Sequence, residues 1–468
     1  MVGVARMTTA PRRFDAIIVG AGQAGPPLAG RLTSAGMKVA LVERKLVGGT
    51  CVNTGCMPTK TLIARARAMH LARRGAELGV FAGDLRFDMK VAAARAREVT
   101  RSAREASEAS LRSMDGLTFL EGHARLAGRS NVTVGDEALE APRIFLNVGG
   151  RANVPGLPGI AEVPYLDNTD MVRLERVPGH LIVVGGSYVG LEFAQMHRRF
   201  GARVTIVERN ERLVAREDRD VSEAIRLVLE GEGVEVRTGA DCIGLARDGA
   251  GVAVSLECEA GPPIVAGSHV LLAVGRRANT DDLGLETAGV ETDAKGFIRV
   301  DQRLRTTAEG IWALGECNGQ GAFTHSAYND FEIVAANLLD GADRRLAMRV
   351  PGYALYTDPP LGRAGMTEEE ARAAGHELLV SVRPMTRVSR AVENGETAGL
   401  MKLVADARTR RILGAAILGI GGDEAIHGIL DLMSAGQPLD ELRWAVPVHP
   451  TVSELLPTLA VELRRVPA

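Results

Sequence analysis

The sequence predicts an α/β protein with two doubly wound units and a C-terminal α+β domain. Two stretches, residues 14–43 and 181–208, each combine a short apolar run, a glycine-rich turn, a helical stretch and a second apolar run that ends at glutamate. From about residue 345 the pattern changes to strand-like runs such as 399–404 and 412–418, which indicate an antiparallel sheet. The chain of 468 residues is long enough for about three domains.

The first copy contains glycines at the spacing that a bound dinucleotide requires. Gly20 makes a tight turn, Gly22 lets the backbone approach a pyrophosphate, and Gly25 allows close packing of helix and strand. Glu43 ends the second strand and can accept hydrogen bonds from a ribose. The order of strand, turn, helix, strand and acid favours a dinucleotide-binding unit over an isolated tight turn.

The second copy repeats the first at an offset of 165 residues. Its corresponding residues are Gly185, Ser187, Gly190 and Glu208. An internal repeat of this kind predicts two Rossmann-like domains and two dinucleotides bound per chain. Ser187 replaces the middle glycine, so the phosphates are expected to fit less closely there.

Glu208 predicts which nicotinamide coenzyme the second copy prefers. A carboxylate at this position pairs with a free 2′-hydroxyl and repels a 2′-phosphate, which favours NADH over NADPH. Arg209 and Arg212 follow closely in the sequence and are able to reach a 2′-phosphate, which weakens this preference.

Cys51 and Cys56 are the candidates for redox chemistry, in the run Gly-Gly-Thr-Cys-Val-Asn-Thr-Gly-Cys-Met-Pro-Thr-Lys from Gly48 to Lys60. If this run leads from a loop into the first turn of a helix, the two sulfurs come within disulfide reach. A helix N-terminus also stabilises a thiolate. The spacing alone leaves open two cysteines that merely pack. Beside two dinucleotide-binding units, we interpret the pair as a redox-active dithiol.

His449 and Glu454 are the candidates for proton transfer near the C-terminus. Interconversion of two thiols and a disulfide needs a proton donor and acceptor near neutral pH, where histidine titrates. Glu454 is placed to orient the imidazole and to stabilise its protonated form. A histidine and a glutamate at this spacing are more often a surface pair, but the cysteines and the two dinucleotide sites favour a catalytic role.

The composition excludes several classes of function. The net charge of −2 implies no polyanionic partner, and the aromatic content of 4% argues against stacking on nucleic-acid bases. No apolar run reaches about 18 residues, and the first 14 residues lack the apolar core of a signal peptide, so we expect a cytoplasmic protein without a membrane span. Cys242, Cys258 and Cys317 have no motif around them and are expected to pack in the interior.

Together these stretches resemble the flavoprotein disulfide reductases of the pyridine nucleotide class, which include dihydrolipoamide dehydrogenase, glutathione reductase and mercuric reductase. The resemblance covers residue 14 to about residue 456, and the run from Gly48 to Lys60 is its most specific motif. It implies an FAD-binding domain in residues 1–150 and 277–345, an NAD(P)-binding domain in residues 151–276 and a dimerisation domain in residues 346–468.

The resemblance also implies a role for each matching residue. Cys56 matches the cysteine nearer the flavin, with which it forms a charge-transfer pair, and Cys51 matches the thiol that attacks the substrate. His449, held by Glu454, matches an acid/base that the partner subunit contributes across a homodimer. Lys60 and Glu192 match an ion pair near the flavin N5. The implied cofactor-binding residues are Gly20, Gly22, Gly25, Glu43, Gly49, Thr50, Lys60, Gly149, Gly315 and Glu316 for FAD, and Gly185, Ser187, Gly190, Glu208 and Gly275 for NAD.

Some residues depart from the family pattern, and they indicate which members of the family this chain resembles most. Glu316 stands where the family has an aspartate that contacts the ribityl chain, so FAD binding must accommodate one more methylene. No cysteine follows Cys317, whereas mercuric reductases usually have a C-terminal cysteine pair, and many of them have tyrosine at the position of His449. The segments 356–363 and 390–397 are most similar to the mercuric-reductase-like subgroup, which also includes copper-reducing enzymes.

We therefore expect an oxidoreductase that passes electrons from NADH through FAD and the Cys51–Cys56 pair to a small-molecule disulfide or a soft metal ion. Dihydrolipoamide dehydrogenase is an alternative within the same family, because the tail from His449 to Glu454 also fits it. A flavin-bound redox sensor without rapid turnover is an alternative of another class. A nucleotide-binding protein with structural cysteines is the simplest alternative.

Overall fold

The computed structural model describes residues 10–257 and 262–466, which form two compact units. The first unit comprises the chain up to Thr61, from Ala93 to Asn153 and from Gly275 to Met348. The second comprises Leu62–Ala92, Val154–Val274 and Arg349–Ala468. Within the described residues, no helix combines the length and the apolar character that crossing a bilayer requires.

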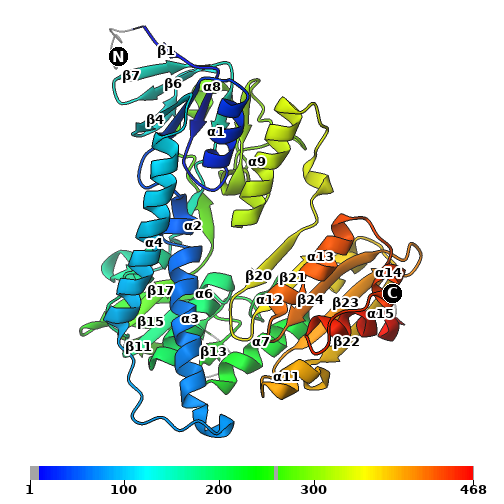
Figure 1. Ribbon diagram of the computed structural model, residues 1–468. Coiled ribbons are helices and arrows are strands. Elements are labelled where there is room, and N and C mark those ends of the chain that lie inside the picture. Colours follow the sequence, from blue (N-terminus) through cyan, green and yellow to red (C-terminus); the bar gives the residue numbers. More distant parts are fainter. Residues whose placement is uncertain (1–9, 258–261, 467–468) are drawn as a thin grey trace. The chain divides into compact units, whose positions relative to one another are not determined.

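The first unit is built on a parallel sheet of five strands in the order β19-β8-β2-β3-β4. Figure 1 labels the edge strand β4 and the helices α1 and α9 of this unit. The central strands are continuous apolar runs because both faces of the sheet are covered, and every residue of Ala16–Val19 is buried. The strands are β2 (Ala16–Val19), β3 (Val39–Glu43), β4 (Leu117–Glu121), β8 (Ile144–Leu146) and β19 (Ile311–Ala313).

Helices and a second sheet complete the first unit. Helix α1 (Gly25–Ser34) packs against α9 (Thr324–Leu339), and both contribute to the core on one face of the parallel sheet. The other elements are α2 (Gly49–Asn53), α8 (Leu285–Ala288), a sheet of β1 (Arg12–Arg13), β7 (Glu137–Glu140), β6 (Asn131–Val134) and β5 (Ala124–Leu126), and the antiparallel pair β9 (Gly150–Ala152) and β18 (Arg276–Ala278).

The second unit begins with a parallel sheet of the same design, in the order β10-β17-β11-β12-β13. Its strands are β10 (Tyr165–Leu166), β11 (His180–Val184), β12 (Arg203–Val207), β13 (Glu235–Arg237) and β17 (His269–Leu272). They are accompanied by α5 (Asn168–Met171), α6 (Tyr188–Phe200), α7 (Arg219–Gly231) and an antiparallel sheet of β14 (Asp241–Asp248), β15 (Gly251–Glu257) and β16 (Ile264–Gly267).

The C-terminal part of the second unit is an antiparallel sheet of six strands in the order β20-β21-β24-β23-β22-β25. Its strands are β20 (Gly352–Leu355), β21 (Leu361–Gly365), β22 (Leu378–Pro384), β23 (Leu400–Asp406), β24 (Ile412–Leu418) and β25 (Arg464–Arg465). Its helices are α10 (Glu368–Ala373), α11 (Ser389–Glu393), α12 (Gly422–Ala425), α13 (His427–Ser434), α14 (Leu439–Trp444) and α15 (Leu456–Glu462). The predicted α/β fold with a C-terminal α+β domain is confirmed.

Two long helices follow α2 in the chain. They are α3 (Cys56–Arg73), which is followed by a 3₁₀ turn (Gly75–Leu78), and α4 (Met89–Arg112). Pro58 lies in the first turn of α3, where an N–H would have no intrahelical partner. Cys56 is the first residue of this helix.

A buried ionic cluster holds the segment before α7 to the C-terminal sheet within the second unit. Arg363 of β21 pairs with Glu217, and their side chains are 1% and 0% exposed. The Tyr353 hydroxyl donates to the other Glu217 oxygen at 2.5 Å. Nearby, the buried Lys402 ammonium lies 2.8 Å from Glu368. Each buried charge therefore has an opposite charge beside it, as burial requires.

Candidate active site

The first glycine turn is held tightly against the end of β8. Gly20 has a φ of +106°, and a Cβ atom at this position would clash with the Asn147 carbonyl oxygen. The Glu43 carboxylate closes the turn by accepting from the backbone N–H of Ala21 at 2.8 Å and of Lys45 at 2.8 Å. The turn therefore has the shape in which backbone N–H groups face a pyrophosphate.

The second glycine turn repeats these contacts at the same offset. Gly185 has a φ of +113°, and a Cβ there would clash with the Ala273 carbonyl oxygen. The buried Glu208 accepts from the Gly186 N–H at 2.5 Å and from the Asn210 N–H at 2.7 Å. The sequence repeat is therefore also a repeat of hydrogen bonds, including the acid that ends the second strand.

Asn147 explains why serine replaces glycine only in the second turn. A Cβ at Gly22 would lie 2.9 Å from the Asn147 Oδ1 atom, which also accepts from the Gly25 N–H. In the second turn the residue at the equivalent position is Ala273, which carries no amide. The second turn therefore lacks the amide that leaves no room for a Cβ at Gly22, and the looser fit of the phosphates expected at Ser187 stays a prediction.

The cysteine stretch is attached to the first glycine turn. The Gly48 N–H donates to the Ala21 carbonyl at 2.8 Å, and the Gln23 amide donates to the Gly48 carbonyl at 3.0 Å. A Cβ at Gly49 would come within 3.2 Å of the Gly22 Cα. Because of these contacts, a dinucleotide seated on the first turn lies close to α2, which carries Thr50 and Cys51.

The two cysteines lie on two different helices. Cys51 lies in the short α2, and Cys56 is the first residue of the 18-residue α3. Both are free thiols in this structure, and the Cys51 side chain forms a hydrogen bond with Cys56. Cys56 is thus at the helix start that the sequence predicts, while Cys51 precedes it in a helix of its own.

The surroundings make the two thiols unequal. The hydrogen bond with Cys56, then burial, then the charge on Cys56 raise the pKa of Cys51 well above its ordinary range. Thr324 and Lys60 act in the opposite direction but are weaker. The Cys51 thiol of the reduced pair therefore holds its proton more strongly than an ordinary cysteine does.

Lys60 and Glu192 belong to different units. Lys60 lies on α3, one turn after Cys56. Glu192 is buried on α6, where its carboxylate accepts from the Tyr356 N–H at 3.1 Å. Their pairing stays a prediction.

His449 and Glu454 meet within the second unit. The His449 Nδ1 atom lies 2.6 Å from Glu454 Oε2, and the two side chains are 76% and 14% exposed. The carboxylate fixes the ring and leaves Nε2 directed away from it. The pair can therefore exchange a proton with a molecule that approaches from outside this unit.

Glu316 has an unexpected partner. Both of its carboxylate oxygens are bound by Arg276, at 2.5 Å and 2.9 Å, and Arg276 also donates to the Gly150 carbonyl at 2.7 Å. A Cβ at Gly150 would lie 2.6 Å from Glu316 Oε2. The Glu316 side chain, which is one methylene longer than aspartate, is thus held by an ion pair with Arg276 and lies against Gly150, which has no Cβ atom.

The remaining predicted residues lie around these elements. Gly315 has a φ of +75°, and its N–H donates to the buried Asp330 at 2.8 Å. Gly149 precedes β9 with a φ of +61°. Gly275, predicted for the NAD site, is grouped with the first unit and accepts from the Asn153 N–H at 3.0 Å.

Sequence reasoning missed Asn147, Asp330 and Thr324. The Asn147 amide connects the Gly25 N–H to the Leu314 carbonyl, and Asp330 accepts from Gly315 and Asn318. Thr324 begins α9, and its Oγ1 lies 3.5 Å from the Cys56 sulfur. A polar residue that directly follows an apolar strand is the signal that points to Asn147.

The other cysteines lie outside this cluster. Cys317 is fully buried, and burial raises the pKa of its thiol to about 12, in agreement with a packing role. The backbone of Cys242 lies in β14, while its side chain and all of Cys258 lie outside the described residues.

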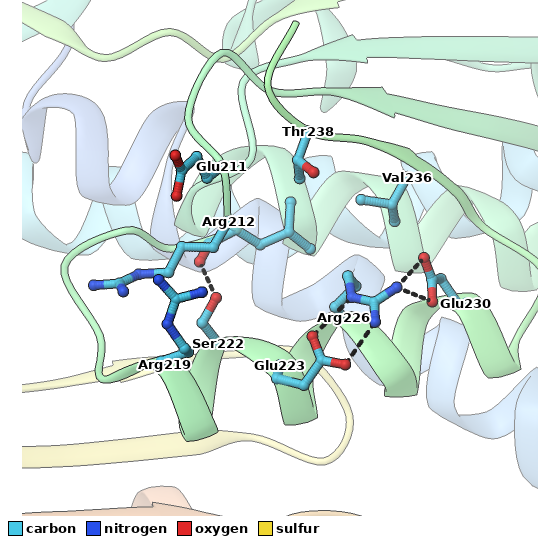
Figure 2. A pocket seen from close by; sticks show the side chains of 10 residues that line it. Glu211, Arg212, Arg219, Ser222, Glu223, Arg226, Glu230, Val236 and Thr238 are labelled. Carbon is cyan, nitrogen blue, oxygen red and sulfur yellow. Dashed lines mark hydrogen bonds and ion pairs between the residues drawn. The ribbon is translucent and has the colours of Figure 1, made fainter. Parts of the chain in front are cut away.

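A pocket of about 170 Å³ lies beside the residues that follow β12 (Figure 2). Arg226 is held between Glu223 and Glu230, and Arg212 pairs with Glu369 at 2.7 Å. The charged side chains that line it are Glu211, Arg212, Arg219, Glu223, Arg226 and Glu230, so their formal charges cancel. The pocket therefore has little attraction for a phosphate.

Comparisons with known proteins agree with this geometry. The family model of the pyridine nucleotide-disulphide oxidoreductases matches residues 14–330, and the model of their dimerisation domain matches residues 351–460. RclA of Escherichia coli, a probable pyridine nucleotide-disulfide oxidoreductase, is 35% identical over 453 residues, which cover 95% of this chain and 98% of RclA.

Two further relatives represent other activities. The mercuric reductase of Streptomyces lividans is 33% identical over 456 residues, covering 96% of each chain. The dihydrolipoyl dehydrogenase of Thermus scotoductus is 34% identical over 458 residues, covering 97% of this chain and 98% of the relative. The solved structure of the Cu(II) complex of RclA, a flavoprotein disulfide reductase induced by HOCl, matches with a TM-score of 0.87 at 34% identity and covers 96% of this chain and 99% of that chain. The chain therefore belongs to the pyridine nucleotide-disulphide oxidoreductase family.

Proposed function

We propose that this enzyme passes electrons from NADH through FAD to the Cys51–Cys56 pair and then to a small-molecule disulfide or a soft metal ion. The observation that carries the proposal is the attachment of the cysteine stretch to the first glycine turn, through Gly48 and Gly49. A dithiol fixed beside a dinucleotide site is an arrangement for electron transfer rather than for packing.

The residues of the first unit fit FAD. The Gly20 turn and the close approach of Gly22 and Gly49 form a cradle that a Cβ atom would fill. The Glu43 carboxylate stands at the end of β3, where a ribose is held in this fold. Bound FAD supplies the two-electron chemistry that connects the nicotinamide coenzyme to the disulfide. The domain bounds given in the sequence analysis remain part of this proposal.

The dithiol carries out the exchange with a disulfide substrate. The partner subunit's His449 takes the proton of Cys51, and the resulting thiolate forms a bond with one substrate sulfur and breaks the substrate disulfide. The partner subunit's His449 then gives this proton to the leaving thiolate. Cys56 attacks Cys51 as a thiolate, which closes the Cys51–Cys56 disulfide and releases the second substrate sulfur as a thiolate that takes a proton from solvent. The substrate gains two electrons, and the dithiol loses two.

The dimerisation domain supports a homodimer, and we propose that its two active sites are shared between subunits. The exposed His449, whose Nε2 atom is directed away from Glu454, is consistent with action on a neighbouring chain. We also propose a cytoplasmic location, because free thiols persist in that compartment.

The coenzyme preference is a testable part of the proposal. We expect wild-type kcat/KM to be higher with NADH than with NADPH, because Glu208 is buried beside the second turn and the adjacent pocket has cancelling charges. Glu208→Gln removes the charge and is expected to reduce the NADH-to-NADPH ratio roughly tenfold. Steady-state kinetics with both coenzymes measure this ratio of kcat/KM values. Glu211→Gln is the matched control, because it removes a carboxylate that lines the adjacent pocket. A wild-type preference for NADPH would contradict the assignment.

The electron acceptor is tested by NADH oxidation with FAD-loaded protein. Lipoamide, oxidised glutathione, copper(II) and mercury(II) are supplied in turn, and thiols are counted before and after NADH addition. We expect two new thiols and saturable turnover with at least one acceptor. Fast turnover with lipoamide would identify a dihydrolipoamide dehydrogenase. New thiols without turnover on any acceptor would identify a redox sensor, and an unchanged thiol count would refute the redox role of the cysteines.

A further inference from the structure

Thr324 and Cys56 bring the first turns of two helices together at one sulfur atom. Cys56 is the first residue of α3, and Thr324 is the first residue of the 16-residue α9. The Thr324 Oγ1 atom lies 3.5 Å from the Cys56 sulfur, within the first unit. Because helix N-termini carry partial positive charge, both helices favour a negative sulfur at this place.

The Thr324 hydroxyl supplies a hydrogen-bond donor for a negative charge on the Cys56 sulfur. A threonine hydroxyl can turn its hydrogen toward an acceptor, and a hydrogen bond to an ionised group is stronger than one between neutral groups. The Thr324 hydroxyl also forms a hydrogen bond with Cys51, but Cys51 lies inside the five-residue α2 and not at the start of a long helix. Thr324 is therefore within reach of both sulfurs, and the long-helix N-termini act on Cys56.

We propose that Thr324 stabilises the reduced dithiol by donating a hydrogen bond to the Cys56 thiolate, and thereby sets the reduction potential of the Cys51–Cys56 couple. The inference rests on the proposed function, since it assigns a role to Thr324 in the same redox centre. Stabilising the thiolate of a reduced pair makes its disulfide easier to reduce. Removing the donor makes the disulfide harder to reduce.

The test is a redox equilibrium of FAD-loaded protein in mixtures of reduced and oxidised dithiothreitol near neutral pH. Reduction breaks the bond between the Cys51 and Cys56 sulfurs. Dithiothreitol supplies two electrons and closes its own disulfide, while one of its protons goes to Cys51 and the other to solvent. Alkylation followed by peptide mass spectrometry gives the reduced fraction, with the buried Cys317 as internal reference.

Two variants separate the hydroxyl from the shape of the side chain. Thr324→Val keeps the branched shape without a donor, and we expect it to need a roughly fivefold higher ratio of reduced to oxidised dithiothreitol for half reduction, or about 20 mV. Thr324→Ser keeps the hydroxyl and is expected to stay within about twofold of wild type. An unshifted Thr324→Val, or a Thr324→Ser shift as large as that of valine, would overturn the proposal.

This outcome is independent of the acceptor assay. If NADH fails to generate thiols, the proposed function fails, whereas the dithiothreitol titration still measures how easily the Cys51–Cys56 disulfide is reduced. If NADH does generate thiols and Thr324→Val is unshifted, only the role of Thr324 is lost.

Discussion

Cys51→Ser is expected to abolish NADH-dependent reduction of disulfides, with turnover at least about a thousandfold below wild type. The serine hydroxyl does not ionise at neutral pH and cannot form the mixed disulfide with the substrate. NADH is still expected to bleach the bound flavin, because in the proposed function the reduction of the flavin precedes the exchange at Cys51. Stopped-flow reduction of the flavin and steady-state disulfide reduction measure the two steps separately.

Cys317→Ser is the matched control for this substitution. The Cys317 thiol is buried and lies within 3.5 Å of the Leu146 and Leu314 carbonyl oxygens, to which a serine hydroxyl can also donate. We expect its disulfide turnover to stay near wild type. Disulfide reductase activity retained by Cys51→Ser would refute the proposed exchange mechanism.

The second large effect is expected on stability, at the buried pair of Glu217 and Arg363. Glu217→Gln removes one charge of a pair that is at most 1% exposed and leaves the buried guanidinium with only the more distant Asp218 carboxylate, at 3.9 Å. Breaking such a pair costs about 3–5 kcal/mol, whereas removing a charge from an exposed pair costs below about 1 kcal/mol. We expect the melting temperature of the second unit to fall by roughly 10 °C.

Glu369→Gln provides the exposed comparison. Glu369 pairs with Arg212, and its side chain is 52% exposed. Calorimetry of both variants measures the difference, and replacing Glu217 by Leu together with Arg363 by Met is expected to recover most of the loss, since it removes both buried charges. Equal shifts for Glu217→Gln and Glu369→Gln would show that the buried pair is not a main source of stability.

The sequence by itself determined the two dinucleotide-binding units, the order of the sheets and the helix start at Cys56. These features depend on contacts close in sequence: apolar runs make buried parallel strands, and glycine is required where φ is positive, as at Gly20 and Gly185. The repeat at a fixed offset was visible for the same reason, because each unit carries its own turn and its own acid.

Only the tertiary structure decided which side chains complete the site. Asn147 follows a strand, Thr324 begins α9 and Asp330 lies within α9. All three are more than 80 residues from Cys56 in the sequence, and no local pattern relates them to it. The family resemblance implies that Glu316 contacts FAD, and only the structure reveals that Arg276, 40 residues away, binds both of its oxygens. Hydrogen bonds and ion pairs join groups by distance in space, and folding sets that distance through the packing of the whole unit.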